Sequence, residues 1–577
     1  MSRSMRILLL LATVSMAAPV ALAQHSQQTP PTEPAEAATP AAPAKPETDI
    51  TAEQLYRYLL GEISSQRGDA RSAVEAFLSL ARDTGDPRLA QRAAEAALRG
   101  SDPALATRAV RQWYTLEPEN QRAEQTLIAL LLSRGQMVEA QPMLQRTLAR
   151  GDSLAAAKVF MQLAEIGART ADKQGAYQLI AELARGYPKV PEARLAVAQA
   201  AKDAQQTMVA VTESKAALDL KPGWAPAVLL LGDLLAEASP REAIALYREH
   251  LAKNPKARDV RVALARVLVA QRDLAGARKE YQTLLGDGPE RPENYLAVAL
   301  LSVDLKDYPA AETYLKKTLA LKFRDASLVY AYLGEVAEAQ KHYGEAIDWY
   351  RKVQPGEQYF SSQLHIAALL AKQGDLAAGR AQLRSLTNSN SGQRIQAVVA
   401  DAQLLRDARA YDDAFQVLSD ALAQEPDSTE LLYDRAMTAE KLNRIDALES
   451  DLRKVMQLKP DYAHAYNALG YTLAERGIRL DEALQLIERA HELAPNDAFI
   501  LDSLGWVHYR LGHLDQGLAY LKNALVVRED PEIAAHLAEV LLAKGNKAEA
   551  RTVTRAALAK SPESEALRAI VKKIDAE

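Results

Sequence analysis

The sequence predicts an all-α fold, a right-handed α-solenoid of about fifteen helical hairpins that ends in one further helix. Small residues recur with a period of about 34 residues between residues 51 and 577. Aromatic residues make up only 6% of the 577 residues, and alanine is abundant, which suits closely packed helices better than a β-sandwich. Prolines close many of the repeats, where they stop a helix.

The first 23 residues have the features of an export signal. Arg3 and Arg6 precede an apolar stretch, and residues 21–23 (Ala-Leu-Ala) form the small-x-small pattern that a signal peptidase cleaves. We expect cleavage after Ala23 and a periplasmic mature chain. The sequence has no cysteine, so we also expect no lipidation. The alternative is an uncleaved anchor, which the shortness of the apolar stretch disfavours.

Residues 24–50 form a Pro- and Ala-rich linker. Six prolines fix the backbone and remove hydrogen-bond donors, so we expect a disordered, solvated segment. It is either a spacer for the folded part or a passive leader.

A small residue marks the middle of each expected first helix of a hairpin, and successive marks are 33 to 36 residues apart. Composition alone would supply small residues but not this regularity. The marks are Gly61, Ala94, Ile128, Ala164, Ala198, Gly232, Ala265, Ala299, Gly334, Ala367, Ala402, Ala436, Gly470, Gly505 and Ala538.

A second series marks the helix that crosses the first, because a large side chain at a close crossing would push the two helices apart. Its members are Ala73, Ala106, Ala140, Ala176, Ala210, Ala243, Ala277, Ala311, Ala346, Gly379, Ala414, Leu448, Ala483, Gly517 and Ala550. Ile128 and Leu448 break the rule, so we expect their repeats to be splayed or irregular.

The repeats fill residues 51–577. Residues 564–575 carry apolar residues at helical spacing, which predicts a helix that covers the last repeat. The polar connection at 387–393 either divides the array into two lobes or is one ordinary loop between repeats, and we favour the loop. The prolines expected to end second helices are Pro118, Pro188, Pro222, Pro255, Pro289, Pro426, Pro460, Pro495 and Pro562.

The residues that carry catalysis in most enzymes are not found in a recognisable pattern. The absence of cysteine excludes disulfides and thiolate metal sites, and the net charge of −5 disfavours sequence-independent nucleic-acid binding. Five histidines gather near the C-terminus, but the register spreads them over several helices, and His508 and His513 are five residues apart, which puts them on different faces of a helix. We therefore predict no enzyme activity, no metal site and no cofactor.

The concave side of such a solenoid is lined by its first helices, and the residue after each small mark should point into it. Six of these fifteen residues are acidic and one is basic, which favours basic or neutral protein segments. The alternative is a merely solvated helix face. The candidates are Glu62, Glu95, Glu165, Asp233 and Glu335, with Glu539 as the sixth.

Three aromatic residues change this lining near the C-terminus. Tyr471, Trp506 and Tyr509 are expected on the inward faces of two consecutive first helices. Exposed Trp and Tyr side chains often anchor a binding site, so we expect this patch to hold an extended peptide or a partner's helix. Packing between helices is the alternative, because such side chains are usually buried.

The repeats resemble the tetratricopeptide superfamily, in the run from Tyr466, Leu469 and Gly470 to Ala483, Ile487, Ala490 and Pro495. A narrower resemblance is to proteobacterial envelope lipoproteins of this type that bind a carboxyl-terminal processing protease. It is carried by the runs 55–68, 86–93, 468–474 and 500–507. It implies a periplasmic adaptor that brings substrates, such as cell-wall hydrolases, to a protease. Those relatives are lipidated on a cysteine, whereas this chain has Gln24 at the corresponding position.

Two binding functions remain open on the sequence. The first is the adaptor for a protease or cell-wall hydrolase that the resemblance implies. The second is a scaffold in an exopolysaccharide or pilus secretion machine. In both, the partner is a protein.

Overall fold

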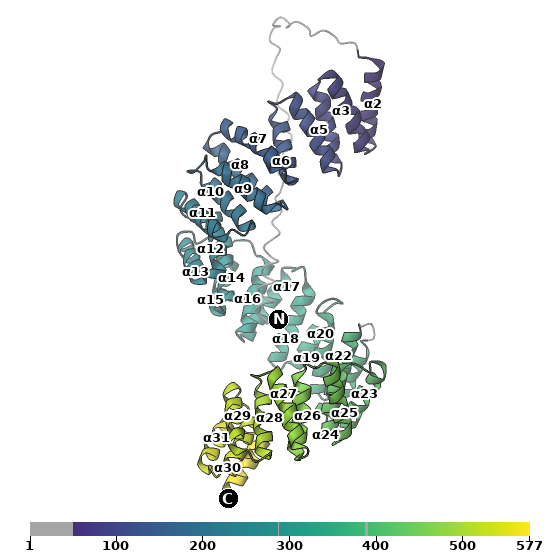
Figure 1. The fold of residues 1–577 in the computed structure, drawn as a ribbon, viewed down its shortest axis with the longest axis vertical. Helices are drawn as coiled ribbons and strands as arrows, with labels where there is room; N and C mark the ends of the chain where they lie inside the picture. Colours follow the sequence, from purple (N-terminus) through teal and green to yellow (C-terminus); the bar gives the residue numbers. More distant parts are fainter. Residues whose placement is uncertain (1–49, 287, 387–389, 577) are drawn as a thin grey trace. The chain divides into compact units, whose positions relative to one another are not determined.

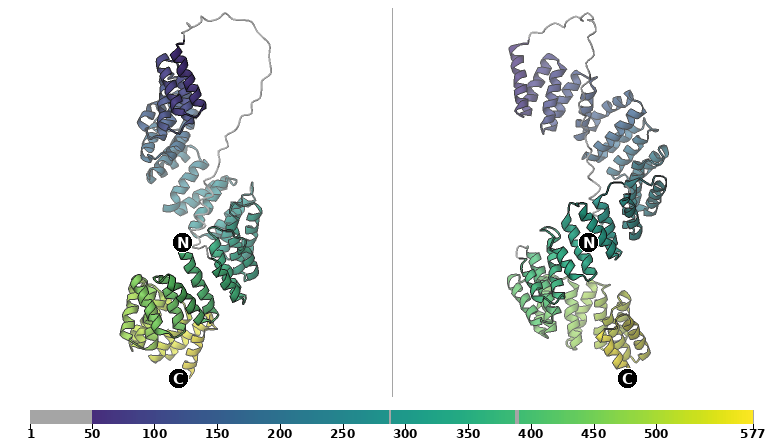
Figure 2. Two further views of the ribbon diagram at one scale, coloured as in Figure 1. Left: turned by 90° about the vertical axis from the view of Figure 1, so that its right-hand side faces the viewer. Right: turned by 180° about the vertical axis from the view of Figure 1, so that it is seen from behind.

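The computed structural model describes residues 50–286, 288–386 and 390–576. The predicted signal peptide, and the predicted linker apart from Ile50, lie outside these residues. All regular elements of the described residues are helices, thirty-one in number (Figures 1 and 2). The chain forms two compact units, Met1–Phe323 and Arg324–Glu577. The connection at 387–393 lies within the second unit, and its residues 387–389 are outside the described ones.

The first unit contains eight hairpins, in which consecutive helices pack antiparallel (Figure 1). Its helices are α2 (Ala52–Gln66), α3 (Ala70–Thr84), α4 (Pro87–Arg99), α5 (Pro103–Leu116), α6 (Gln121–Ser133), α7 (Met137–Arg150), α8 (Ser153–Arg169), α9 (Lys173–Ala184), α10 (Pro191–Asp203), α11 (Thr207–Leu220), α12 (Ala225–Ala238), α13 (Pro240–Lys253), α14 (Arg258–Ala270), α15 (Leu274–Leu285), α16 (Pro292–Asp304) and α17 (Tyr308–Ala320).

The second unit contains seven hairpins and the final helix. Its helices are α18 (Ala326–Ala339), α19 (Tyr343–Tyr350), α20 (Tyr359–Lys372), α21 (Leu376–Arg384), α22 (Ser391–Asp407), α23 (Tyr411–Gln424), α24 (Thr429–Lys441), α25 (Ile445–Leu458), α26 (Ala463–Arg476), α27 (Leu480–Leu493), α28 (Ala498–Arg510), α29 (Leu514–Val527), α30 (Pro531–Ala543), α31 (Lys547–Lys560) and α32 (Glu565–Ala576).

The ends of the helices follow from short polar signals. Thr51 begins α2 with a capping box, in which its side chain accepts from the Gln54 amide and the Gln54 side chain accepts from the Thr51 amide. Aspartates such as Asp307 cap second helices in the same way, here through the Ala310 amide at 3.4 Å. The turn before α17 contains Lys306 at φ 59°, a left-handed conformation that costs a non-glycine residue free energy.

The two series of small residues describe the hairpins correctly. The first series lies in the even-numbered helices α2 to α30 and the second in the odd-numbered helices α3 to α31, and every member except Ala164 is buried. The final helix is also confirmed, because Leu567, Ile570 and Ile574 of α32 are buried against α30 and α31. The fold is therefore the predicted solenoid of hairpins with a C-terminal covering helix.

Five hairpins pair a glycine in the first helix with a large side chain in the second. At Gly232 a Cβ atom would lie 2.2 Å from Cζ of Tyr247, a ring that is 1% exposed. The larger side chain thus occupies the space that a Cβ would need, which keeps the two helices close. The five pairs are Gly61 with Phe77, Gly232 with Tyr247, Gly334 with Tyr350, Gly470 with Ile487, and Gly505 with Leu521.

The two exceptions to the small-residue rule behave differently. The Ile128 hairpin, α6–α7, is packed less closely than most, and its second helix contains Pro142 in its interior. The Leu448 hairpin, α24–α25, packs as closely as its neighbours, with Leu448 fully buried. The prediction of an irregular repeat is therefore wrong for Leu448. Its larger side chain is accommodated in the same buried cluster as Ala436.

Ion pairs join neighbouring repeats along the turns between first and second helices. The Arg444 guanidinium lies 2.6 Å from Asp412 and that of Arg479 2.6 Å from Glu449, each pair about one repeat apart in sequence. The Arg444–Asp412 pair is largely exposed and contributes little, about 0–1 kcal/mol. Glu449 is half-buried and accepts from both Nη atoms of Arg479, which lowers the pKa of its carboxyl to about 2. Among the residues described, no helix combines the length and apolar character needed to cross a membrane.

Candidate protein-binding surface

The three aromatic candidates lie together on α26 and α28, the first helices of two successive hairpins. The Trp506 and Tyr509 ring centroids are 5.1 Å apart, and all three residues pack against the core of the second unit. A fourth ring joins them from α30: His536 stacks on Trp506 at 4.3 Å and lies 6.2 Å from Tyr471. We call these four side chains the aromatic cluster.

Trp506 is buried rather than exposed. Only 6% of the residue is accessible, and its indole Nε1 donates to Oε2 of Glu475 at 2.7 Å. The expectation of an exposed tryptophan anchor is therefore wrong, because the neighbouring repeat covers the ring with His536. Tyr471 and Tyr509 are partly exposed and form the accessible edge of the cluster.

His536 is fixed by a carboxylate one repeat away. Its Nδ1 lies 2.9 Å from Oδ2 of Asp502, a residue that is 7% exposed. Burial alone would lower the pKa of His536, but the hydrogen bond and charge of Asp502, with the charges of Glu475 and Glu532, raise the pKa above its ordinary value. A protonated imidazole over the indole face is stabilised further by a cation–π contact.

Carboxylates from four successive first helices surround Tyr471. Burial raises the pKa of its phenol above the ordinary value, and nearby negative charges raise it further. These charges belong to Glu475, Asp502, Glu532 and Glu440, on α26, α28, α30 and α24. Glu475 and Glu532 are exposed, so the rim of the cluster presents negative charge to the solvent.

The acidic residues predicted to line the first unit are mostly paired within the chain. Glu62 accepts from Nε of Arg92 at 3.1 Å, and Asp233 forms an ion pair with Lys202. Glu95 accepts from the Gln91 side chain at 3.0 Å. Neighbouring repeats therefore neutralise much of the expected acidic strip there.

Two further candidates complete the predicted row. Glu165, on α8, is exposed. Glu335, on α18 in the second unit, is half-buried and has an interaction partner within the protein.

Three C-terminal histidines lie closer together than the sequence indicated. His513 follows the end of α28 and begins α29, so its ring returns to His508, with the two Nδ1 atoms 3.4 Å apart. Tyr520 stacks on His508 and contacts His491 edge-on. The prediction that His508 and His513 lie on different faces of one helix is wrong, because the chain turns between the two residues. Within 50–286, 288–386 and 390–576 no three potential ligands converge on a metal position.

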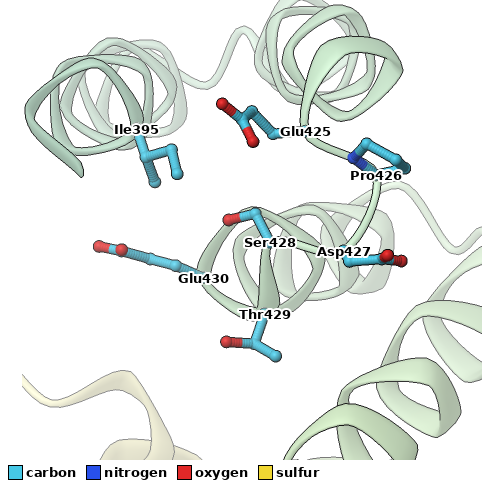
Figure 3. A pocket seen from close by; sticks show the side chains of 7 residues that line it. All are labelled: Ile395, Glu425, Pro426, Asp427, Ser428, Thr429 and Glu430. Carbon is cyan, nitrogen blue, oxygen red and sulfur yellow. The ribbon is translucent and has the colours of Figure 1, made fainter. Parts of the chain in front are cut away.

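A surface hollow with a volume of about 440 Å³ lies at the turn before α24 (Figure 3). Two of its carboxylates already have partners: Glu425 accepts from the Ser391 hydroxyl at 2.8 Å, and Asp427 lies 2.9 Å from Nζ of Lys454. The hollow is open and polar, and we assign it no function. Its lining residues are Ile395, Glu425, Pro426, Asp427, Ser428, Thr429 and Glu430.

The sequence indicated the aromatic residues but not the groups that hold them. Asp502 and His536 are 34 residues apart, and Glu475 and Trp506 are 31 apart, so each pair links equivalent regions of neighbouring repeats. Adding one repeat length of about 34 residues to 502 identifies His536, whereas the Glu475–Trp506 pair departs from that spacing by three residues.

Two proteins from Pseudomonas species are similar to parts of this chain. The chain is 41% identical over 207 residues to a TPR repeat-containing protein of Pseudomonas aeruginosa, a match that covers 36% of this chain and 35% of that protein. It is 24% identical over 351 residues to the cellulose synthase operon protein C of Pseudomonas fluorescens, covering 57% of this chain and 27% of that protein. The chain thus matches only about a third of the length of these relatives.

Solved structures of repeat proteins also align with the chain. A TPR protein of Thermus thermophilus is 27% identical and aligns over 32% of this chain and all of its own, with a TM-score of 0.30. Yeast Tom70 is 15% identical and aligns over 73% of this chain and 95% of its own, with a TM-score of 0.37.

Sequence models of the tetratricopeptide repeat match residues 234–301, 296–359 and 503–565. The matched segments coincide with α12 to α19 and α28 to α31, the hairpins described above. Residues 234–359 and 503–565 therefore match tetratricopeptide repeats, which are modules of protein–protein interaction.

Proposed function

We propose that this chain is a non-catalytic, protein-binding scaffold and that the rim of the aromatic cluster takes a basic segment of a partner protein. The observation that carries the proposal is the combination of two partly exposed tyrosines, Tyr471 and Tyr509, with the exposed carboxylates of Glu475 and Glu532. Flat apolar surface and negative charge together suit lysine or arginine side chains, whose stems pack on rings while their charged ends meet carboxylates.

The buried part of the cluster gives this rim a fixed shape. Trp506 is held by the Glu475 carboxylate and by the His536 ring, and His536 is in turn held by Asp502. Side chains that are fixed before binding lose little conformational entropy when a partner arrives.

We propose further that the scaffold acts in the periplasm and presents substrates to an envelope protease or cell-wall hydrolase. The apparent export signal at 1–23 and the resemblance of the runs 55–68 and 500–507 to envelope adaptors support this proposal.

A second candidate is a scaffold of an exopolysaccharide secretion machine. The observation that favours it is the match to a protein named for a cellulose synthase operon. The two candidates differ in the partner that should co-purify from the periplasm: a protease or hydrolase, or a synthase or export component.

Peptide binding tests the chemistry of the site. Two extended peptides of equal length, one rich in lysine and one rich in glutamate, should differ in affinity for the full chain, with the lysine peptide tighter and its affinity falling with salt. Glu532→Lys should weaken the lysine peptide about tenfold. Glu563→Lys is the matched control. Glu563 is exposed in the loop before α32, so its substitution makes the same charge change away from the aromatic cluster. Equal affinity for both peptides, or equal effects of both variants, would exclude the proposed site.

Affinity purification from periplasmic extract tests the adaptor. We expect a protease or hydrolase to co-elute and its activity on its substrate to rise when the purified chain is added. If the rate of the protease or hydrolase does not change, the adaptor function is contradicted. The proposed peptide-binding site is not affected by that result.

A further inference from the structure

The outer face of α2 carries the densest group of exposed apolar side chains in the described part of the chain. Leu55, Tyr56, Leu59, Leu60 and Ile63 are all between 40% and 66% exposed. Together they present on the order of 500 Å² of side-chain surface, near the upper end of the largest apolar patch on a typical monomer.

These five residues form one continuous stripe. Leu55, Leu59 and Ile63 follow at intervals of four residues, and Tyr56 and Leu60 lie beside them, so the stripe spans an arc of roughly 140°. Arg57 lies outside this arc and pairs with Asp83 at 2.7 Å. An arc of this width is what a helix buries against a neighbouring helix.

The C-terminal end of the array shows how such a face is normally covered. There α32 buries Leu567, Ile570 and Ile574 against the last hairpin and turns Lys572 and Lys573 outwards. No described helix does this for α2. The preceding segment 24–49 contains no Leu, Ile, Val, Met, Phe, Tyr or Trp, so its side chains cannot supply an apolar stripe to cover α2.

We propose that α2 pairs with α2 of a second copy of this chain, antiparallel and around a two-fold axis at Leu59. Leu59 is the central residue of Ala52–Gln66, and Leu55 and Ile63 lie four residues to either side of it. An antiparallel pair therefore sets Leu55 of one copy against Ile63 of the other and leaves Leu59 facing its own equivalent.

The area that would be buried and the charges at the helix ends favour a second copy of the chain as the partner of α2. Pairing two stripes removes on the order of 1,000 Å² from solvent, the lower limit for a specific interface. Antiparallel helices also bring opposite dipole ends together. Stacking head to tail is disfavoured, because it would bury the exposed Lys572 of α32 against the apolar stripe of α2. This pairing is independent of the proposed peptide site, which lies on α26 to α30.

The mass of the full chain in solution tests the proposal. Light scattering over a hundredfold range of concentration should show a dimer that dissociates on dilution. Leu59→Lys should weaken the dimer more than tenfold, because it places two like charges at the axis. Val526→Lys is the matched control: Val526 is 85% exposed on α29, and its variant should remain dimeric. Leu59 is itself exposed, so its variant should keep the helical content of the parent.

The absence of native cysteine allows a second readout. Leu59→Cys should form a disulfide-linked dimer under mild oxidation, whereas Val526→Cys should not. A monomer at every concentration, or equal cross-linking of the two cysteine variants, would overturn the proposal. Protection of α2 from hydrogen exchange in a monomer would assign its face to residues 1–49 of the same chain and would likewise overturn it.

Discussion

Replacing Gly232 by alanine tests the idea that glycine lets α12 and α13 approach closely. The added Cβ would lie 2.2 Å from Cζ and 2.4 Å from the hydroxyl of Tyr247. Ordinary contact begins near 3.4 Å, so the overlap is more than 1 Å. Tyr247 is only 1% exposed and cannot swing into solvent, so either the ring leaves its rotamer or the two helices separate.

The expected change in the free energy of unfolding follows from two opposing effects. Overpacking of this kind costs about 1–3 kcal/mol, while exchanging glycine for alanine inside a helix contributes about 1 kcal/mol in the other direction. Because the overlap exceeds 1 Å, the overpacking cost should lie in the upper part of that range, and we expect a net loss of about 1–2 kcal/mol. Gly167→Ala is the control: its Cβ would lie 3.4 Å from Ile180 and 3.6 Å from Ala176, so this variant should gain about 0.5 kcal/mol.

Hydrogen exchange is the appropriate assay, because a repeat array opens locally rather than as one cooperative unit. Amides of α12 and α13 should exchange about fivefold to thirtyfold faster in Gly232→Ala than in the parent. Combining Gly232→Ala with Tyr247→Leu should cost less than the sum of the two single variants. If Gly232→Ala is as stable as Gly167→Ala, the close-approach argument is refuted.

Three other predictions concern single positions. Lys306→Gly should raise stability by about 0.5 kcal/mol, since glycine tolerates φ 59° although it has more freedom when unfolded; urea denaturation showing a loss would contradict this. Ile570→Ala should cost about 2–4 kcal/mol in α32 and speed proteolysis of the C-terminus, and unchanged cleavage would argue against a covering role. The folded pKa of His536 is raised, so its pairing with Asp502 contributes stability that is complete below pH 6.5 and is lost as the pH rises through the folded pKa. The stability of the parent should therefore fall more steeply than that of His536→Gln as the pH rises from about 6 to 8, and parallel curves would refute the assignment.

The sequence predicted the hairpins because the constraint is local. A small residue is favoured where two helices cross closely, and small residues occupy the marked positions from Gly61 to Ala550 except at Ile128 and Leu448. The covering helix was predictable for the same reason, since its apolar spacing mirrors that of the repeat beneath it.

The details of the site depend on the side-chain contacts between neighbouring repeats. The 34-residue spacing of the small residues does not predict these contacts. The register grouped Trp506 with Tyr509, and their rings do lie together, but the burial of Trp506 depends on the His536 ring of the next hairpin and on the Glu475 carboxylate of the previous one. The contact between His508 and His513 was missed because the chain reverses between them. The spacing also did not predict that Leu448 would be fully buried at a position where a small residue was expected.

The exposed ion pairs between neighbouring repeats have a mechanical consequence within each unit. Each exposed pair, such as that of Arg444 with Asp412, is weak and screened by salt, and these pairs act in series along the unit. Tension applied along a unit is therefore shared among many small openings, so the unit should stretch elastically and become softer as ionic strength increases.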